Sequence, residues 1–294
     1  MTNEIQERSF GTHNGSFHAD EVTACALLIL FDHIDLDKVI RTRDLHALRT
    51  CDYVCDVGGM YEPTIRRFDH HQLDYHGPLS SAGMILKYLK DEKVIKDKLF
   101  QYLNRSLVMG VDAIDNGKTT TMVGHCSFSA VIANFVPIRH NVDENVMDEA
   151  FFQAVDFTLG HLSRLVDKFH YIQECREVIK REMDKNQTVM IFEESMPWME
   201  TFFDLKGEKH PAAFLIMPSG KQWKLRGIPP SYEKRMQVRI PLPKEWAGLI
   251  DDELKDKTGI PGAVFCHKGR FISIWETKED ALKALEITLQ KADK

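Results

Sequence analysis

The stretch Thr64-Ile65-Arg66-Arg67-Phe68-Asp69-His70-His71 places a carboxylate and two imidazoles directly after a run of β-forming residues. We expect a strand over residues 64–68 that delivers these three polar side chains at its carboxyl end. Neutral imidazole and carboxylate are side chains that bind divalent first-row metal ions. An Asp beside a His also fixes the tautomer of the ring. Seven of the 13 histidines lie in the first 76 residues, which favours a metal site in the first half of the chain.

The first half of the chain alternates strand-like and helix-like segments, and this order predicts an α/β domain with a mainly parallel sheet flanked by helices. The expected strands cover residues 9–13, 38–43, 53–55 and 64–68, and the expected helices cover residues 21–31, 80–89, 99–114 and 128–135. Ligands of such sheets bind at the carboxyl ends of the strands. His13, Asp56 and the Asp69-His70-His71 group each follow a strand, so we expect them to lie on one rim.

The candidate metal ligands come from four patches: His13, His18, Asp20, Asp56, His70 and Asp112. One interpretation is a two-metal site, whose ions lie about 3.5–4 Å apart, clamp a phosphoryl group and lower the pKa of the attacking water. Asp56 is the expected bridging ligand. Asp69 and His71 are expected to support the ligands or face the substrate. Asp56, Asp69, His70 and His71 are therefore the candidate catalytic residues, whereas Asp115 is interpreted as a local cap.

The second half of the chain differs from the first in its expected secondary structure. A chain of 294 residues is expected to form two domains. A long helical stretch over residues 144–185, expected as two helices or as one helix broken near Gly160, leads into short β-like runs. These runs cover residues 188–192, 212–217, 222–226, 237–240, 263–266 and 271–275, and a closing helix starts at Lys278. We predict a catalytic domain over residues 1–185 with linking helices, and a smaller α+β domain over residues 186–294.

Residues 221–244 form a basic tract with seven cations and one acid, in a chain whose net charge is −6. Trp223 and Tyr232 are interleaved with these cations, and cations combined with aromatic rings are typical of single-stranded nucleic-acid binding. Contacts to backbone phosphates would make such binding depend on salt. The candidate substrate-binding residues are Lys221, Lys224, Arg226, Arg235 and Arg239, with His267 and Arg270 at a hairpin tip.

The remaining composition excludes several classes of protein. The six cysteines form no CxxC pair and no regular framework. The first residues carry no signal core and no arginine-rich presequence, and no apolar run is long enough to span a bilayer. We therefore expect reduced thiols, a cytoplasmic or nuclear location and no membrane partner. The oligomeric state stays open.

Four motifs carry a resemblance to a known family. Gly11-Thr12-His13-Asn14-Gly15-Ser16-Phe17-His18-Ala19-Asp20-Glu21, Val54-Cys55-Asp56-Val57-Gly58-Gly59 and Arg67-Phe68-Asp69-His70-His71-Gln72 are three of them, and Gly259-Ile260-Pro261-Gly262-Ala263-Val264-Phe265-Cys266-His267 is the fourth. Together they resemble the melanocyte-proliferating-gene exonuclease family, within the DHH phosphoesterase superfamily. The resemblance runs from near residue 10 to near residue 270. Residues 118–127 and the end of the chain from Ser273 depart from it.

The resemblance implies roles for single positions. It matches His13, His18 and Asp20 to the first metal-binding motif, Asp56 to the bridging Asp of the second, His70 to the metal-binding His of the third, and Asp112 to the fourth. His71 matches the following His, which faces substrate, and Asn14 is a further substrate-binding candidate. Many superfamily members carry an Asp where His18 stands.

The function implied by this resemblance is that of a manganese-type 3′-5′ RNA exonuclease, with a DHH-type two-domain fold and an active-site cleft between the domains. Two divalent ions are expected, manganese first, with magnesium, cobalt or zinc as alternatives. RNA or single-stranded DNA is the expected substrate, and family members can be mitochondrial. The alternatives are a small-molecule phosphatase or pyrophosphatase of the same superfamily, and a non-catalytic metal- or RNA-binding protein.

Overall fold

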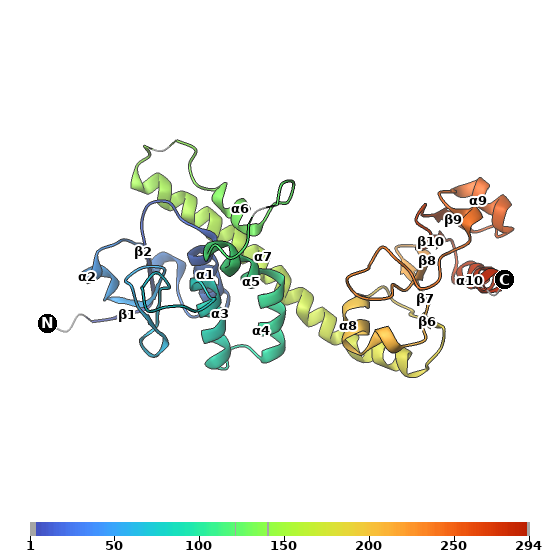
Figure 1. Cartoon of the computed structure of the whole chain (residues 1–294), viewed down its shortest axis with the longest axis horizontal. Coiled ribbons are helices and arrows are strands. Elements are labelled where there is room, and N and C mark those ends of the chain that lie inside the picture. The colour runs from blue at the N-terminus through green and yellow to red at the C-terminus, as the bar shows by residue number, and fades with distance from the viewer. Residues whose placement is uncertain (1–3, 121, 140, 293–294) are drawn as a thin grey trace. The chain divides into compact units, whose positions relative to one another are not determined.

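The computed structural model describes residues 4–120, 122–139 and 141–292. The chain divides into two compact units, Met1–Phe169 and His170–Lys294, and the boundary falls inside the long helix α7 (Glu144–Asp184; Figure 1). This helix continues without the break that we expected near Gly160, because a single glycine weakens a helix but leaves its hydrogen bonds in place. Within the described residues, no helix is long and apolar enough to cross a membrane.

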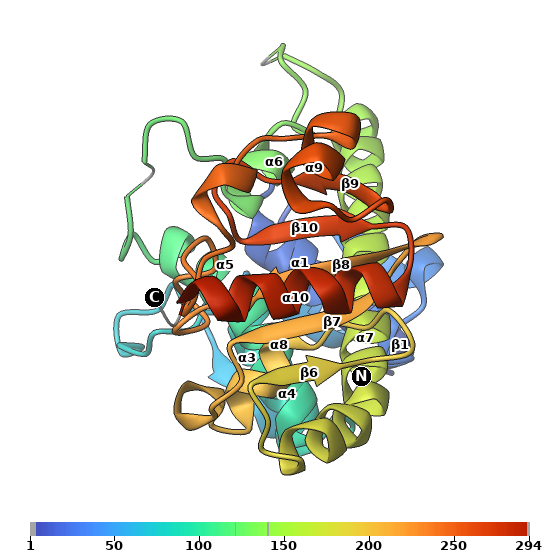
Figure 2. The same ribbon diagram turned by 90° about the vertical axis from the view of Figure 1, so that its right-hand side faces the viewer.

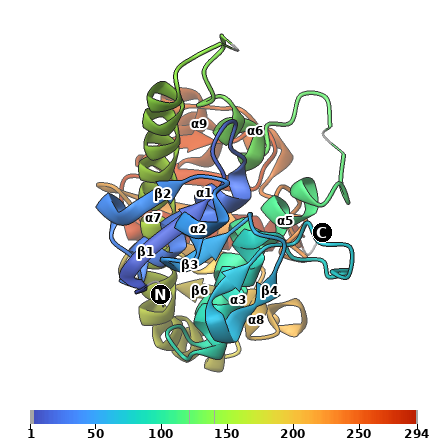
Figure 3. The ribbon, with the colours of Figure 1, turned by 90° about the vertical axis from the view of Figure 1, so that its left-hand side faces the viewer.

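The first unit is built on a five-stranded sheet in the order β2-β1-β3-β5-β4. Its strands are β1 (Gln6–Thr12), β2 (Val39–Arg41), β3 (Cys51–Cys55), β4 (Tyr61–Glu62) and β5 (Arg67–Phe68). All neighbouring pairs are parallel except β4 with β5. Figure 3 shows β2, β1 and β3 side by side. The predicted α/β domain with a mainly parallel sheet is confirmed, and the carboxyl ends of β1, β3 and β5 meet at one edge.

The strand predicted over residues 64–68 is shorter than expected. Pro63–Ile65 forms a 3₁₀ turn, in which the Glu62 side chain accepts a hydrogen bond from the Thr64 amide, and Arg66 adopts a left-handed conformation with φ of 57°. Only Arg67 and Phe68 pair with β3. This short strand still places Asp69, His70 and His71 at the predicted edge.

Helices cover this sheet and supply part of the site. They are α1 (Ala19–Leu30), α2 (Leu45–Leu48), α3 (Ser81–Asp91), α4 (Asp97–Leu103), α5 (Met109–Asp115) and α6 (Phe128–Ala133), with a 3₁₀ turn at Leu36–Lys38. In α1 every residue from Ala19 to Leu28 is buried, which explains its continuous apolar sequence. A π-helical segment, Asn104–Val108, joins α4 to α5.

The second unit contains a five-stranded sheet in the order β6-β7-β8-β10-β9. Its strands are β6 (Val189–Ile191), β7 (Phe214–Ser219), β8 (Gln222–Gly227), β9 (Ala263–Cys266) and β10 (Ile272–Trp275); its helices are α8 (Met199–Asp204), α9 (Asp251–Thr258) and α10 (Lys278–Ala292), with 3₁₀ turns at Gly207–Lys209 and Lys244–Trp246. Only β6 and β7 pair in parallel. Helix α10 lies across one face (Figure 2), over a core that includes Leu225, Trp246 and Trp275. The predicted α+β unit is confirmed, but residues 237–240 form no strand.

Candidate metal centre

The first histidine of the cluster follows β1, and its ring is held between two carboxylates. Nε2 of His13 lies 3.2 Å from Oε1 of Glu21 and 3.2 Å from Oδ2 of Asp56. Its other nitrogen, Nδ1, lies 3.0 Å from the carbonyl oxygen of Asn14. The side chain is almost fully buried. An imidazole fixed from both sides in this way presents one nitrogen to whatever occupies the cluster.

Asp56 follows β3 and lies at the centre of the cluster. Its carboxylate lies within 3.2 Å of the ring of His13 and within 3.3 Å of the rings of His70 and His71. The residue has φ of 59°, a left-handed conformation that costs an Asp about 1 kcal/mol or more. The surrounding contacts therefore hold the backbone in a conformation that aims the carboxylate at three imidazoles.

His70 connects the carboxylates of Asp20 and Asp115 to the cluster. Its Nε2 lies 3.1 Å from Oδ2 of Asp115, 3.3 Å from Oδ1 of Asp56 and 3.8 Å from Oδ2 of Asp20. The groups close enough to share an ion are His13, His18, Glu21 and Asp56; Asp56, His70 and His71; and His18, Asp20 and Asp115. Three of these carboxylates, those of Asp20, Glu21 and Asp56, are buried.

The cluster fits divalent cations, because many of its buried polar atoms have no hydrogen-bond partner. Within the described residues, the atoms without one include both carboxylate oxygens of Asp20, Oε2 of Glu21, Oδ1 of Asp56 and Nε2 of His70. An unpaired buried carboxylate is very costly. Several of them in one place, interleaved with imidazoles, form the mixed nitrogen and oxygen set that a divalent transition metal binds.

The electrostatics of the cluster point the same way. Burial raises the pKa of Asp20 well above its usual value, and the neighbouring Asp56 carboxylate adds to this rise. Burial alone would lower the pKa of His13, but its hydrogen bonds with Asp56 and Glu21 outweigh burial and raise that pKa to about 10. Burial opposes the same rise at His70, where Asp115 and Asp56 bring the pKa to about 10. Protons on these groups thus reduce the repulsion between the carboxylates, and a metal ion must displace those protons in order to bind.

Asp69 positions the exposed histidine beside the cluster. Its Oδ2 accepts a hydrogen bond of 2.6 Å from the Gly59 amide, and its Oδ1 accepts bonds from the amide of His71 at 3.1 Å and from Nδ1 of the same residue at 2.9 Å. The His71 side chain is 63% exposed. Nδ1 is therefore the protonated nitrogen, and Nε2 is free to meet a ligand from solvent.

The structure places Asp112 outside the three candidate ligand groups. Oδ1 of Asp112 accepts hydrogen bonds from the Ser80 amide at 3.0 Å, the Ser80 hydroxyl at 2.7 Å and the Gly83 amide at 3.0 Å. A Cβ at Gly83 would lie 2.2 Å from Oδ2 of Asp112, so only glycine fits there. Asp112 therefore caps α3. Asp115, one turn later, lies beside His70 instead.

Glu21 is a member of the cluster that the sequence analysis did not single out. Its Oε1 accepts a hydrogen bond of 2.8 Å from the His18 amide, and the residue has no exposed surface. A Glu three residues after the residue that begins a helix is the signature of a capping box. That spacing, combined with an apolar helix whose face is buried, was the signal that could have identified a buried carboxylate. Asn14, a predicted substrate-binding residue, donates a hydrogen bond of 2.9 Å to Glu144.

Two of the predicted substrate-binding cations lie on the sheet face opposite α10. Side chains alternate along a strand, and Leu225 faces the core under α10, so Lys224 and Arg226 face the other way. Both are partly buried, and burial lowers both pKa values. The guanidinium of Arg226 lies 5.6 Å from the ring centre of Phe271, and its Nε has no hydrogen-bond partner among the described residues. Among the described residues, neither Lys224 nor Arg226 has a carboxylate partner that compensates its positive charge.

The other cations of the basic tract differ from one another in their surroundings. The Arg239 guanidinium group donates hydrogen bonds to four main-chain carbonyl oxygens, those of Gly207, His210, Ala212 and Pro229. Arg235 lies 4.0 Å over the ring of Tyr232, and Lys221 is exposed in the turn between β7 and β8. Arg270 and His267 lie in the β9–β10 turn, where the His267 ring is 4.3 Å from that of Phe271. Trp223 packs against the core beneath α10.

Comparison with known proteins places the whole chain in one family. The MYG1_exonuc model, described as "Uncharacterised protein family (UPF0160)", matches residues 9–289. The chain is 51% identical over 284 residues to the MYG1 protein of Chlamydia muridarum, covering 97% of each chain. It is 30% identical over 321 residues to the MYG1 exonuclease of Homo sapiens, covering 95% of this chain and 85% of that one.

Solved structures give a weaker likeness. RecJ from Thermus thermophilus in complex with Mn²⁺ has a TM-score of 0.28 and 11% identity, over 97% of this chain and 52% of that one. An exonuclease RecJ bound to manganese has a TM-score of 0.29 and 11% identity, over 99% of this chain and 91% of that one. The resemblance to the melanocyte-proliferating-gene exonucleases is confirmed by the family match, which spans both units, and the chain belongs to the MYG1 exonuclease family.

Proposed function

We propose that this protein is a divalent-metal-dependent exonuclease that hydrolyses RNA or single-stranded DNA, with 3′-5′ degradation of RNA as the expected activity. The observation that carries the proposal is the cluster of unpartnered buried carboxylates and imidazoles at the carboxyl ends of three parallel strands. Relatives named MYG1 exonuclease in human, rat and mouse support it.

In this proposal the metal ligands are His13, His18, Asp20, Glu21, Asp56, His70 and Asp115. Asp56 and His18 each belong to two of the three groups, but only the carboxylate has two oxygens to share between two ions, which supports Asp56 as the bridging ligand. Asp115 takes the place that the sequence analysis gave to Asp112. Bound ions would neutralise a phosphoryl group and lower the pKa of an attacking water. Manganese is the proposed ion, because mixed imidazole and carboxylate ligands suit it, although magnesium, cobalt and zinc are also compatible.

The protein's own groups orient the substrate. His71, held by Asp69 and exposed, would present Nε2 to the substrate. Burial alone would raise the pKa of Asp56, but before an ion binds, the His13 and His70 rings outweigh burial and lower that pKa to about 2, so the carboxylate is already charged when an ion arrives. Lys224 and Arg226 would contact phosphates of a single strand, and Phe271, which lies beside Arg226, would contact a base.

The test uses a 5′-labelled RNA 20-mer and the DNA of the same sequence, with Mn²⁺ or with EDTA. We expect a ladder shortening from the 3′ end on RNA with Mn²⁺, which is blocked by a 3′-phosphate and lost in Asp56→Asn. Pyrophosphate and p-nitrophenyl phosphate are offered in parallel, because turnover of these alone would favour a small-molecule phosphatase. Binding of Mn²⁺ without any hydrolysis would refute the enzyme assignment.

A further inference from the structure

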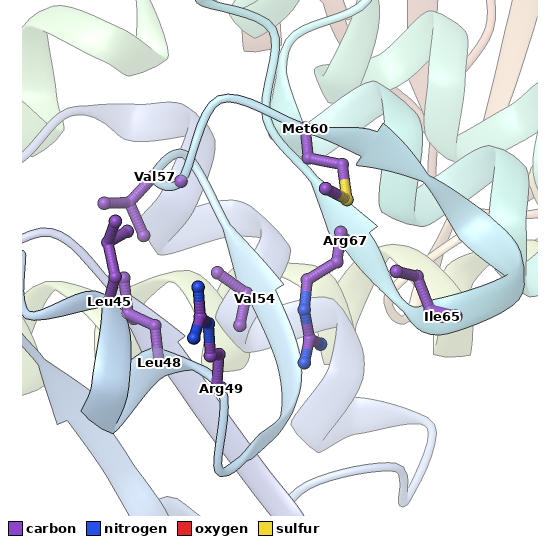
Figure 4. Close-up of a pocket in the computed structure, with 9 residues that line it drawn as sticks. Leu45, Leu48, Arg49, Val54, Val57, Met60, Ile65 and Arg67 are labelled. Atoms are coloured by element: carbon purple, nitrogen blue, oxygen red, sulfur yellow. The ribbon is translucent and has the colours of Figure 1, made fainter.

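A cavity of about 310 Å³ opens on the first unit and is lined by none of the proposed metal ligands. Figure 4 shows its lining, which includes the apolar side chains of Leu45, Val54, Met60 and Ile65 and the cationic side chains of Arg49 and Arg67. Pockets of this volume, mostly apolar and with a few fixed polar groups, are typical of small-molecule sites. None of these residues belongs to a candidate metal-binding group.

The cavity lies beside an incompletely covered face of the parallel sheet. Helix α2 is four residues long, and its Leu48 packs on Cys51 and Val54. Leu45, Met60 and Ile65 are 54%, 47% and 54% exposed, although all three line the same cavity. Parallel sheets normally have both faces covered. Large apolar side chains gathered around one hollow, rather than scattered, favour a binding surface.

Arg67 gives this surface a fixed positive charge without a carboxylate partner among the described residues. Nη1 donates hydrogen bonds to the carbonyl oxygens of Asp52 and Arg66, and Nη2 donates one to that of Cys51, at 3.1–3.2 Å. These three bonds hold the guanidinium group in place and leave the Nε–H and one Nη2–H without partners in the described part of the chain. A guanidinium group uses such a pair of donors to bind an acidic group in a bidentate manner.

Arg49 adds a second, exposed cation to the same hollow. Its guanidinium group makes no hydrogen bond or ion pair with any residue that the structure describes. In Figure 4 the side chains of Arg49 and Arg67 lie on either side of Val54. The cavity thus combines an apolar floor and rim with two cations, and its charge selects an anion.

We propose that this cavity binds a small amphipathic organic anion, with its acidic head on Arg67 and its apolar body among Leu45, Met60 and Ile65. The acidic head is a carboxylate, sulfonate or phosphate, since each offers two oxygens to the guanidinium group. The proposal does not depend on the exonuclease assignment, because none of its residues belongs to the metal centre.

The experiment titrates the full-length chain with 8-anilinonaphthalene-1-sulfonate, an amphipathic anion whose fluorescence reports apolar binding. We expect one saturable site from which decanoate displaces the probe and decanol, the neutral counterpart, does so poorly. Comparison of decanoate with decyl phosphate distinguishes a carboxylate from a phosphate ligand. Arg67→Gln should weaken binding about tenfold, the size expected for a lost charge-assisted hydrogen bond.

Ile65→Glu, at an exposed rim position, should weaken probe binding at least as much without disturbing the fold. Arg43→Gln and Ile250→Glu are the matched controls, because both residues are exposed and lie outside the cavity. Arg49→Gln replaces Arg67→Gln if the latter unfolds. Equal probe binding in Ile65→Glu, Arg49→Gln and the wild type would overturn the proposal. So would self-association that Ile65→Glu abolishes while decanoate fails to bind, since the face would then join two copies of the chain.

Discussion

Two aspartates one helical turn apart should behave in opposite ways when they are replaced. Asp112 accepts three hydrogen bonds at the start of α3, whereas Asp115 lies 3.1 Å from Nε2 of His70 among the proposed metal ligands. We expect Asp112→Ala to lower the stability of the fold with little effect on metal affinity. We expect Asp115→Asn to weaken metal binding, and its cost to the metal-free protein should be limited to the lost pairing with His70.

The magnitudes follow from what each side chain touches. Asp112→Ala leaves the amides of Ser80 and Gly83 without their acceptor, which costs about 2 kcal/mol. For a unit of this size, that corresponds to a lower Tm by about 4–8 °C. Asp115→Asn removes the charge of a proposed coordinating carboxylate, so the loss of Mn²⁺ affinity should exceed the roughly 10–100-fold loss typical of residues that only support a ligand.

Two measurements decide between the residues. Thermal unfolding in EDTA reports the stability of the metal-free protein, and calorimetric titration with Mn²⁺ reports affinity at one pH. Asp143→Asn is a control, because Asp143 is an exposed carboxylate outside the candidate ligand groups. If Asp112→Ala abolished Mn²⁺ binding while Asp115→Asn bound it normally, the assignment of Asp115 would be refuted.

Three other outcomes follow from the structure. His13 and His70 have pKa values raised to about 10, so in EDTA they stabilise the fold fully below their unfolded pKa of about 6.5, and this stabilisation is lost as pH rises toward 10. The affinity for Mn²⁺ should increase over the same interval, because the ion displaces fewer protons. Tm scans in EDTA and Mn²⁺ titrations from pH 6 to 10 should show both trends, and flat curves would contradict them. Lys224→Gln and Arg226→Gln should each reduce the slope of log affinity for single-stranded RNA against log salt by up to about 1, measured by fluorescence anisotropy, and an unchanged slope would remove these cations from the interface. Arg239→Met should instead lower Tm by several degrees in unfolding scans, because four carbonyl oxygens lose their donor, and an unchanged Tm would count against this structural role.

The sequence was most informative where chemistry and strand ends coincide. His13, Asp56 and His70 follow predicted strands, and parallel pairing of β1, β3 and β5 brings them together for that reason alone. Strand 64–68 was predicted too long, because Pro63 and the left-handed Arg66 form a turn that the β-forming composition of the segment does not indicate.

The sequence could not decide which carboxylate of a helix faces the cluster. Asp112 and Asp115 are one turn apart, and their directions depend on the phase of a helix that contains a π-helical segment. The basic tract was equally ambiguous. Arg239 and Arg226 are equivalent cations in the sequence. In the structure, Arg239 donates hydrogen bonds to main-chain carbonyl oxygens, whereas Arg226 lies beside the ring of Phe271.

The π-helical segment Asn104–Val108 lets this region carry one residue more than a regular helix of the same length. A π turn holds one residue more than an α turn, so a single deletion there would restore a regular helix and leave the direction of all that follows nearly unchanged. Asp112 would still face α3 and Asp115 would still face His70, whereas a deletion in the α-helical residues just before Asp112 would rotate both by about 100°. A chain that loses the surplus residue, by descent or by design, can therefore still present both carboxylates from this helix.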